Sequence, residues 1–280
     1  MFKKATKKQS LLRLSIYGPS GSGKTYSSMS IATGLSEKKV AVIDSERGSA
    51  SKYAGKFNFD VAELKDHSIE SYITAIKQAV GIYDVLIIDS LTHAWTCLKD
   101  ENDKVAREKF RGNTWAAWSK LTPKHNRLID EICRFPGHII VTMRSRNVWE
   151  NEGKTPIHKG FMPDQRDSCV YEFDMVMRMD IGHKATIEKD RTGVFQSDVI
   201  EKPDKKFGKE LKKWLFEGEP NDLISEENIK KLQEEAKGNI EEAKKMLQEK
   251  GYEKTSDVKN EDLEYLLNQF KTIKSKEQQK

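Results

Sequence analysis

Long apolar runs and paired cysteines are both missing from this 280-residue sequence. No stretch approaches the roughly 18 apolar residues of a membrane-spanning helix, so we expect no membrane association. The basic N-terminal residues 1–10 precede no apolar stretch, so we expect no secretory signal. The three cysteines form no C-x-x-C motif and have no histidines at zinc-binding spacing. We therefore predict a reduced, cytoplasmic protein with buried thiols.

A large excess of charge of one sign is also absent. The chain has 49 Lys and Arg against 44 Asp and Glu, a formal net charge of +5, and 33% of its residues are charged. Because the charge is spread along the chain, the net charge is weak evidence for a polyanionic partner. The positions of the basic residues are more informative. The length allows one large domain, or one domain and an appendage.

One glycine-rich stretch fits the motif G-x-x-x-x-G-K-[ST] at every constrained position. An alternating strand pattern precedes it and a helical pattern follows it, which is the context that this phosphate-binding loop requires. Its backbone N–H groups and the helix N-terminus bind phosphates, Lys24 reaches the β- and γ-phosphates, and the Thr25 hydroxyl is a Mg²⁺ ligand. The sequence therefore predicts a nucleoside triphosphate site. The predicted nucleotide-binding residues are Gly18, Pro19, Ser20, Gly21, Ser22, Gly23, Lys24, Thr25 and Tyr26.

Beyond this loop, buried strand patterns alternate with helical ones, which indicates an α/β fold with a mostly parallel sheet and helices on both faces. Residues 144–168 have no periodicity and are predicted to form a long loop, functional or disordered. The predicted strands are 39–44, 57–61, 83–90 and 138–143, the helices are 68–80 and 91–135 with a break near Gly112, and a β-hairpin joins 170–180 to 184–189 through Gly182 and His183.

Changes in composition divide the chain into four expected parts. These are a basic N-terminal arm at 1–10, a nucleotide-binding core at 11–217, a linker at 218–224 and a C-terminal helical module at 225–275. The module is expected to hold three short helices, the first of which opens with capping residues from Ser225 to Asn228.

Two acidic residues are candidates for chemistry at the phosphates. Asp89 ends a buried strand, where an aspartate can hold Mg²⁺ through its water shell. Its neighbour Ser90 is not an acid, so a general base must come from elsewhere. Glu46 follows the second strand, which we expect to lie beside the P-loop strand, and it could orient or deprotonate the attacking water. The alternative is a surface acid that pairs with Arg47.

Together these elements resemble the RecA-type recombinase core. The resemblance rests on the P-loop, on Asp44-Ser45-Glu46 after the second strand and on Asp89-Ser90 after the third, and it covers roughly residues 10–215. It implies a RecA-like P-loop ATPase fold in which Glu46 is the catalytic glutamate. The run 188–193 resembles the K-x-[KR] element by which RecA-like and hexameric-helicase ATPases touch the γ-phosphate of the adjacent subunit. This implies that Lys189 and Arg191 act in trans.

A closer resemblance is to small phage-encoded RecA-like proteins of the AAA type, which are minimal recombinases or single-strand annealing proteins. Residues from Ser225 onward resemble a helical module of phage recombination proteins, which implies docking of a single-strand-binding protein. Two features depart from RecA. Its long N-terminal polymerisation domain has no counterpart, and its γ-phosphate-sensing glutamine is replaced by Thr142, Arg144 and Ser145. Of these, Arg144 is the candidate for the sensing role.

RecA-like proteins bind single-stranded DNA through two loops, which match residues 95–118 and 144–168 here. In the second region cations interleave with Trp149 and Phe161, which suits a flexible strand because charge follows the phosphates and rings stack on the bases. The tryptophans of the first region could equally belong to the core. The candidate DNA-binding residues are Arg144, Arg146, Lys154 and Lys159.

The sequence thus predicts an ATPase that uses ATP and Mg²⁺, is stimulated by single-stranded DNA and forms a homo-oligomeric ring or filament in the cytoplasm of a host cell. Its expected role is homologous annealing or strand pairing in phage DNA recombination or replication. An ATP-binding switch or partner-docking protein with little turnover is one alternative, and a helicase-like motor is another. No arginine-rich lid, N-K-x-D motif or signature helix supports a kinase, a GTPase or an ABC-type ATPase.

Overall fold

The computed structural model describes residues 7, 9–37, 39–153, 155–218, 224, 226–237, 239–252 and 254–277, without the side chains of residues 152, 226, 261 and 273–277. Backbone contacts divide the chain into two units, Ser10–Glu217 and a second unit that includes Gly218–Lys280. Most of the predicted N-terminal arm, most of the predicted linker and the candidate DNA-binding residue Lys154 lie outside the described residues.

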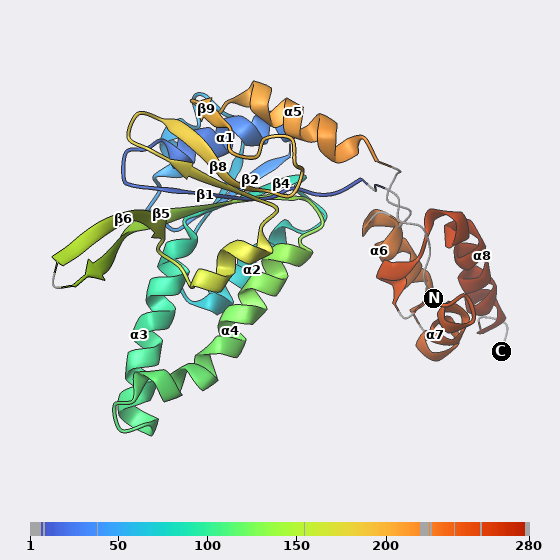
Figure 1. The fold of residues 1–280 in the computed structure, drawn as a ribbon. Coiled ribbons are helices and arrows are strands. Elements are labelled where there is room, and N and C mark those ends of the chain that lie inside the picture. The colour runs from blue at the N-terminus through green and yellow to red at the C-terminus, as the bar shows by residue number, and fades with distance from the viewer. Residues whose placement is uncertain are drawn as a thin grey trace. The chain divides into compact units, whose positions relative to one another are not determined.

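The first unit is built on a sheet that has nine strands in the part of the chain described (Figure 1). The strands are β1 (Arg13–Gly18), β2 (Val40–Asp44), β3 (Asp60–Glu63), β4 (Val85–Asp89), β5 (His138–Glu152), β6 (Thr155–Pro163), β7 (Met175–Met179), β8 (Lys184–Asp190) and β9 (Val199–Glu201). Their order is β3-β2-β4-β5-β1-β7-β8-β9, and β6 pairs with β5 outside this path. Pairings from β3 through β7 along this order are parallel, and those of β6, β8 and β9 are antiparallel.

Helices cover both faces of this sheet, as the alternating sequence pattern predicts. The helices of the unit are α1 (Lys24–Leu35), α2 (Ile69–Ala79), α3 (Leu91–Lys109), α4 (Thr114–Arg134) and α5 (Lys205–Phe216), with short 3-10 turns at Ala50–Tyr53 and Asp167–Glu172. Successive residues of β4 face opposite layers: Leu86 and Ile88 pack with α2, α3 and α4, whereas Val85 and Ile87 pack with α1 and α5. Figure 1 shows these two layers on either side of the sheet.

Two glycines allow α1 and α5 to touch backbone to backbone. A Cβ atom on Gly34 would overlap the carbonyl oxygen of Lys205 and the Cα of Gly208, and a Cβ on Gly208 would overlap the carbonyl oxygen of Ile31. Since α1 starts at the P-loop, this contact fixes the helix that carries the phosphate-binding residues against a second helix.

The structure corrects three of the predicted elements. Residues 144–168 do not form a loop: β5 continues to Glu152, and β6 returns beside it as an antiparallel partner. The predicted strand at 170–180 begins at Met175, because the residues before it form a 3-10 turn. The edge strand predicted at 57–61 starts at Asp60. The helix break near Gly112, which has a positive φ of 86°, is confirmed between α3 and α4.

The second unit holds three helices among its described residues, α6 (Glu226–Glu235), α7 (Ile240–Glu249) and α8 (Asn260–Glu277), and a 3-10 turn at Thr255–Asp257. Their apolar faces enclose a small core of Ile224, Leu232, Ala243, Leu247, Val258, Leu266 and Phe270. In neither unit do the described residues include a helix with the length and apolar character needed to cross a membrane.

Candidate active site

The P-loop lies between the end of β1 and the start of α1, at the carboxyl edge of the parallel strands. Gly23 is the N-cap of α1, has a φ of 89°, and has no side chain to cap the helix. The first N–H groups of α1 are therefore left for an external acceptor, and the helix dipole favours an anion there. Gly18 is required for packing, because a Cβ on it would overlap the carbonyl oxygen of Met179 at the end of β7.

A cavity of about 590 Å³ lies over this loop. It brings together residues that the sequence places in three separate motifs, the P-loop, Glu46 and Asp89, and it adds four others, Tyr53, Arg144, Ser145 and His183. Its lining consists of Gly18, Pro19, Ser20, Gly21, Gly23, Lys24, Thr25, Tyr26, Glu46, Tyr53, Asp89, Arg144, Ser145 and His183.

Asp89 lies at the bottom of the site, buried and held by two hydroxyl groups. Thr25 Oγ1 donates a hydrogen bond to Asp89 Oδ2 at 2.6 Å, and Thr142 Oγ1 donates one to Oδ1. Burial raises the pKa of Asp89, and the two hydroxyl donors oppose part of that rise. A cation beside this carboxylate would offset the cost of burying its charge. Thr25 and Asp89 thus lie together as oxygen ligands of the type that Mg²⁺ prefers.

Lys24 is the cation of the P-loop itself. Its Nζ donates to the carbonyl oxygen of Pro19 at 2.9 Å. Burial lowers the pKa of Lys24, while the nearby carboxylates of Asp89 and Glu46 raise it. The partly desolvated ammonium group therefore lies among acids inside the cavity, where a phosphate would add further compensating charge.

Glu46 reaches the cavity by a route that differs from the predicted one. The strand before it, β2, pairs with β3 and β4, so β4 and β5 separate it from the P-loop strand β1. The loop after β2 crosses this gap because its backbone is anchored: Asp44 accepts from the N–H groups of Glu46 and Ala50, and the Ser45 N–H donates to the carbonyl of Asp89.

The carboxylate of Glu46 pairs with Arg144 and not with Arg47. Arg144 Nη2 and Nε both donate to Glu46 Oε1, at 2.9 and 3.2 Å. Among the described residues, Glu46 Oε2 has no hydrogen-bond donor, so one oxygen of the carboxylate stays available to water. Arg144, which by sequence is a candidate both for DNA binding and for sensing the γ-phosphate, thus lines the P-loop cavity.

Two further candidate DNA-binding residues, Arg146 and Lys159, lie on the β5–β6 hairpin. Arg146 forms an ion pair with Asp167 at 2.7 Å, and Lys159 forms one with Glu150 at 3.5 Å. The hairpin also presents aromatic side chains: Trp149 is 59% exposed and Phe161 is 42% exposed, and the ring of His158 contacts both. The hairpin thus presents cations, partly balanced by acids, beside exposed rings.

Lys189 and Arg191 lie outside the P-loop cavity of their own chain. Strand β8 runs antiparallel to β7, so its last residue Asp190 pairs with Met175, at the end of β7 opposite to the P-loop. Lys189 Nζ donates to the carbonyl oxygens of Val170 and Tyr171, and Arg191 bonds to Tyr171 and pairs with Asp174 at 3.3 Å. Neither residue lines the P-loop cavity.

His183 is a site residue that sequence reasoning missed. Its Nδ1 lies 3.1 Å from the carbonyl oxygen of Ser22, so Nδ1 is the donor, and its backbone has a φ of 63°. Tyr53 was also missed. It contacts Tyr26 edge-on at a centroid distance of 6.0 Å, and the two rings form one wall of the cavity. The only sequence signal for His183 was its place in a predicted turn.

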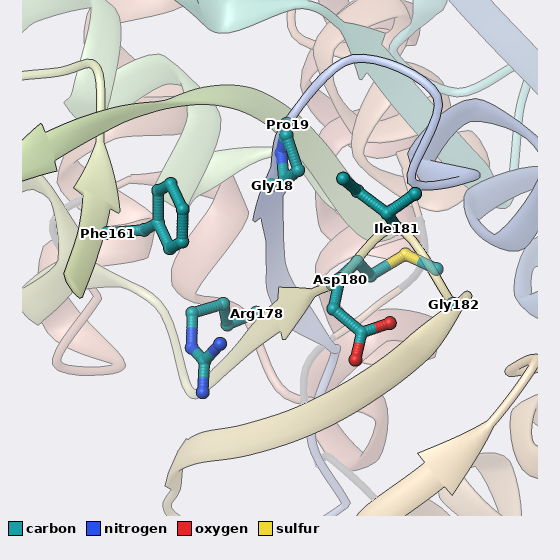
Figure 2. A pocket seen from close by; sticks show the side chains of 8 residues that line it. Gly18, Pro19, Phe161, Arg178, Asp180, Ile181 and Gly182 are labelled. Atoms are coloured by element: carbon teal, nitrogen blue, oxygen red, sulfur yellow. The ribbon is translucent and has the colours of Figure 1, made fainter.

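A second cavity, of about 320 Å³, adjoins the P-loop on the side of β7 (Figure 2). It is lined by Gly18, Pro19, Phe161, Arg178, Met179, Asp180, Ile181 and Gly182. Next to it, Glu188 accepts from Arg178 Nε at 2.7 Å and from the Tyr17 hydroxyl at 2.6 Å. These contacts connect the residue before the P-loop to strand β8. Across the described residues there is no cluster of three His, Cys, Asp or Glu side chains that could hold a metal.

A protein-family model described as an AAA domain matches residues 10–209. No match was found among curated proteins. Among solved structures, the RadB recombinase is similar at 20% identity and a TM-score of 0.39, over 64% of this chain and 80% of that one. A prototypical ATPase from the type III secretion system of pathogenic bacteria is similar at 16% identity and a TM-score of 0.38, over 93% and 80%.

The family match, the sheet and the position of the P-loop together confirm the predicted fold class. The described residues of the first unit form an α/β fold with a mostly parallel sheet flanked by helices, of the RecA-like P-loop ATPase type.

Proposed function

This chain belongs to the AAA domain family, and from that premise we propose that it uses ATP hydrolysis to control the binding and pairing of single-stranded DNA. The observation that carries the ATPase part is the single cavity in which Lys24, Thr25, Glu46, Asp89 and Arg144 meet. A P-loop that only stored a nucleotide would have no need of a carboxylate placed across the cavity from it.

Each of these residues has a role in the proposed reaction. Thr25 and Asp89 would hold Mg²⁺, which neutralises charge on the phosphate oxygens when it is bound. Lys24 binds the β- and γ-phosphates. Glu46, oriented by Arg144 through Oε1, uses its open Oε2 to accept a proton from the attacking water. Arg144, which lines the same cavity, would donate to the γ-phosphate.

The basic pair at the end of β8 supports the proposal of a homo-oligomer. Lys189 and Arg191 lie away from their own P-loop, and Arg191 is 59% exposed. We propose that they reach the γ-phosphate bound by the next subunit in a ring or filament, as the resemblance of residues 188–193 implies. Without that subunit, the cavity would lack two of its catalytic cations.

The β5–β6 hairpin is the proposed single-strand site. Exposed rings such as Trp149 stack on bases of any sequence, and side chains such as Arg146 and Lys159 follow the phosphates. The wider setting, annealing or strand pairing in phage recombination, and docking of a single-strand-binding protein by the helices after Ser225, are proposed from the resemblance of the sequence.

One observation favours a second candidate, an ATP-binding switch with little turnover. The ion pair with Arg144 engages the carboxylate of Glu46, and a carboxylate that stays paired with an arginine is not free to turn toward an attacking water. In that case ATP would act as an on-signal for partner docking, and hydrolysis would be slow and indifferent to DNA.

Steady-state phosphate release with and without single-stranded DNA separates the two candidates, with Lys24→Ala as the inactive control. We expect DNA to raise the rate, Lys24→Ala to abolish hydrolysis, and an annealing assay with complementary strands to require ATP. A slow rate that DNA leaves unchanged would reject the proposed DNA-coupled ATPase in favour of the switch.

A further inference from the structure

The turn between β7 and β8 lies beside the P-loop. Ile181 and Gly182 of this turn line one cavity together with Gly18 and Pro19 (Figure 2). The next residue, His183, places Nδ1 at 3.1 Å from the carbonyl oxygen of Ser22 and lines the nucleotide cavity. The turn therefore shares a cavity with the first residues of the loop and contacts the loop near its last glycine.

The hydrogen bond from His183 to the Ser22 carbonyl oxygen fixes the orientation of the Ser22–Gly23 peptide. In a trans peptide the carbonyl oxygen and the N–H of the next residue point in opposite directions. When His183 donates a hydrogen bond to the Ser22 carbonyl oxygen, the Gly23 N–H points away from His183. A flip of this peptide would instead turn the carbonyl, a negative dipole end, toward the place where the N–H now points.

His183 also has a backbone conformation that few side chains adopt. Its φ of 63° lies in the left-handed region, where glycine is favoured and where Asn and His are the better tolerated side chains. Glycine would suit the turn better on conformational grounds alone. Strain retained at a ligand cavity is a signature of functional positioning.

We propose that His183 is a positioning residue for the nucleotide, which locks the Ser22–Gly23 peptide in the orientation that presents backbone N–H groups to phosphates. The inference rests on the proposed nucleotide site, and it adds a residue from outside the P-loop motif to that site. His183 acts through the loop backbone and not on the reacting atoms.

Two substitutions separate the hydrogen bond from the backbone strain. Both Gly and Asn accept a positive φ, but only the Asn side chain keeps a donor close to the position of Nδ1. His183→Gly therefore relieves strain and removes the contact, whereas His183→Asn keeps both the turn and the contact. Ser197→Gly is the matched control, because Ser197 also has a positive φ, of 67°, and does not line the cavity.

The test measures ATP affinity by calorimetry and hydrogen exchange of the peptide covering residues 18–26 in the ligand-free protein. We expect His183→Gly to weaken ATP binding about fivefold, the loss of one hydrogen bond, and to speed exchange in this peptide, without lowering the melting temperature. His183→Asn and Ser197→Gly are expected to match the wild type in both readouts.

Wild-type affinity and exchange in His183→Gly would overturn the proposal, and so would equal weakening in the Gly and Asn variants. The exchange readout needs no nucleotide. If the wild type failed to bind ATP while His183→Gly still loosened residues 18–26, the proposed nucleotide function would be refuted and the positioning role of His183 upheld.

Discussion

Replacing Glu46 by Gln tests the proposed base with the smallest change in shape. Gln keeps an oxygen that Arg144 can reach, and it removes the negative charge that lets Oε2 accept a proton. A positioned general base contributes about 10²- to 10⁴-fold to a rate, which corresponds to about 2.7–5.4 kcal/mol of activation free energy. We therefore expect turnover to fall by at least about a hundredfold.

The effect on folding is expected to be much smaller, because the Glu46–Arg144 pair is only partly buried. The two side chains are 28% and 54% exposed. Pairs exposed to this degree contribute about 0.2–1 kcal/mol, since water screens them. For a chain of this size that corresponds to a change in melting temperature of about 2 °C or less. A hundredfold loss of turnover would thus exceed anything that partial unfolding could explain.

The assay combines steady-state phosphate release, ATP binding by calorimetry and thermal melting on the same preparations. Glu63→Gln is the matched control, because Glu63 ends the neighbouring strand β3 and does not line the cavity. If Glu46→Gln turned over ATP within twofold of the wild type, Glu46 could not be the base. Faster turnover in Arg144→Gln would instead show that the ion pair restrains Glu46, as the switch candidate requires.

Three further predictions follow from the packing. Gly34→Ala should destabilise the protein by about 2 kcal/mol or more, because the new methyl group overlaps the α5 backbone; chemical denaturation measures this, and a stable variant would contradict the packing of α1 on α5. Thr142→Val removes one hydrogen-bond donor to the buried Asp89 carboxylate, so it should lower the free energy of unfolding by about 1–3 kcal/mol. It should also raise the Mg²⁺ concentration that half-saturates hydrolysis. His138 is 5% exposed and accepts from the Leu12 N–H, and burial lowers its pKa to about 4. The unfolded chain binds a proton at His138 near pH 6.5, and the folded chain does not. The free energy of unfolding should therefore be full above pH 6.5 and fall by on the order of 3 kcal/mol between pH 6.5 and 4. Denaturation at several pH values measures this loss, and His138→Asn should remove most of it.

The sequence was sufficient for the parts of the site that lie next to one another along the chain. The P-loop, the strand before it and the helix after it are local, and Asp89 ends a run of apolar residues that can only be a buried strand. The α/β class follows from the alternation of such runs with helical ones. In each case the signal is a spacing of a few residues, which hydrophobic periodicity reports directly.

The remaining parts of the site depend on which strands become neighbours in the sheet. No local sequence pattern contains that information. Strand β5 lies between the P-loop strand and the strand that ends in Asp89, and this order brings Thr142 and Arg144 into the site. His183 arrives from a turn 161 residues beyond Ser22. The β5–β6 hairpin escaped detection for a different reason: most of β6 is exposed, so it has no buried face to produce an alternating apolar pattern.

The length of β5 has a mechanical consequence. One strand of 15 residues carries Thr142 against Asp89, then Arg144 in the cavity, and then Trp149 on the hairpin, and its pairing with β6 shifts register between Val148 and Trp149. No glycine or proline between Arg144 and Trp149 provides a hinge, and five residues of extended chain span about 17 Å. A ligand that tilted the hairpin would therefore move Arg144, which pairs with Glu46. The binding of a ligand to the hairpin and the position of Arg144 at the phosphates would then be coupled through one strand.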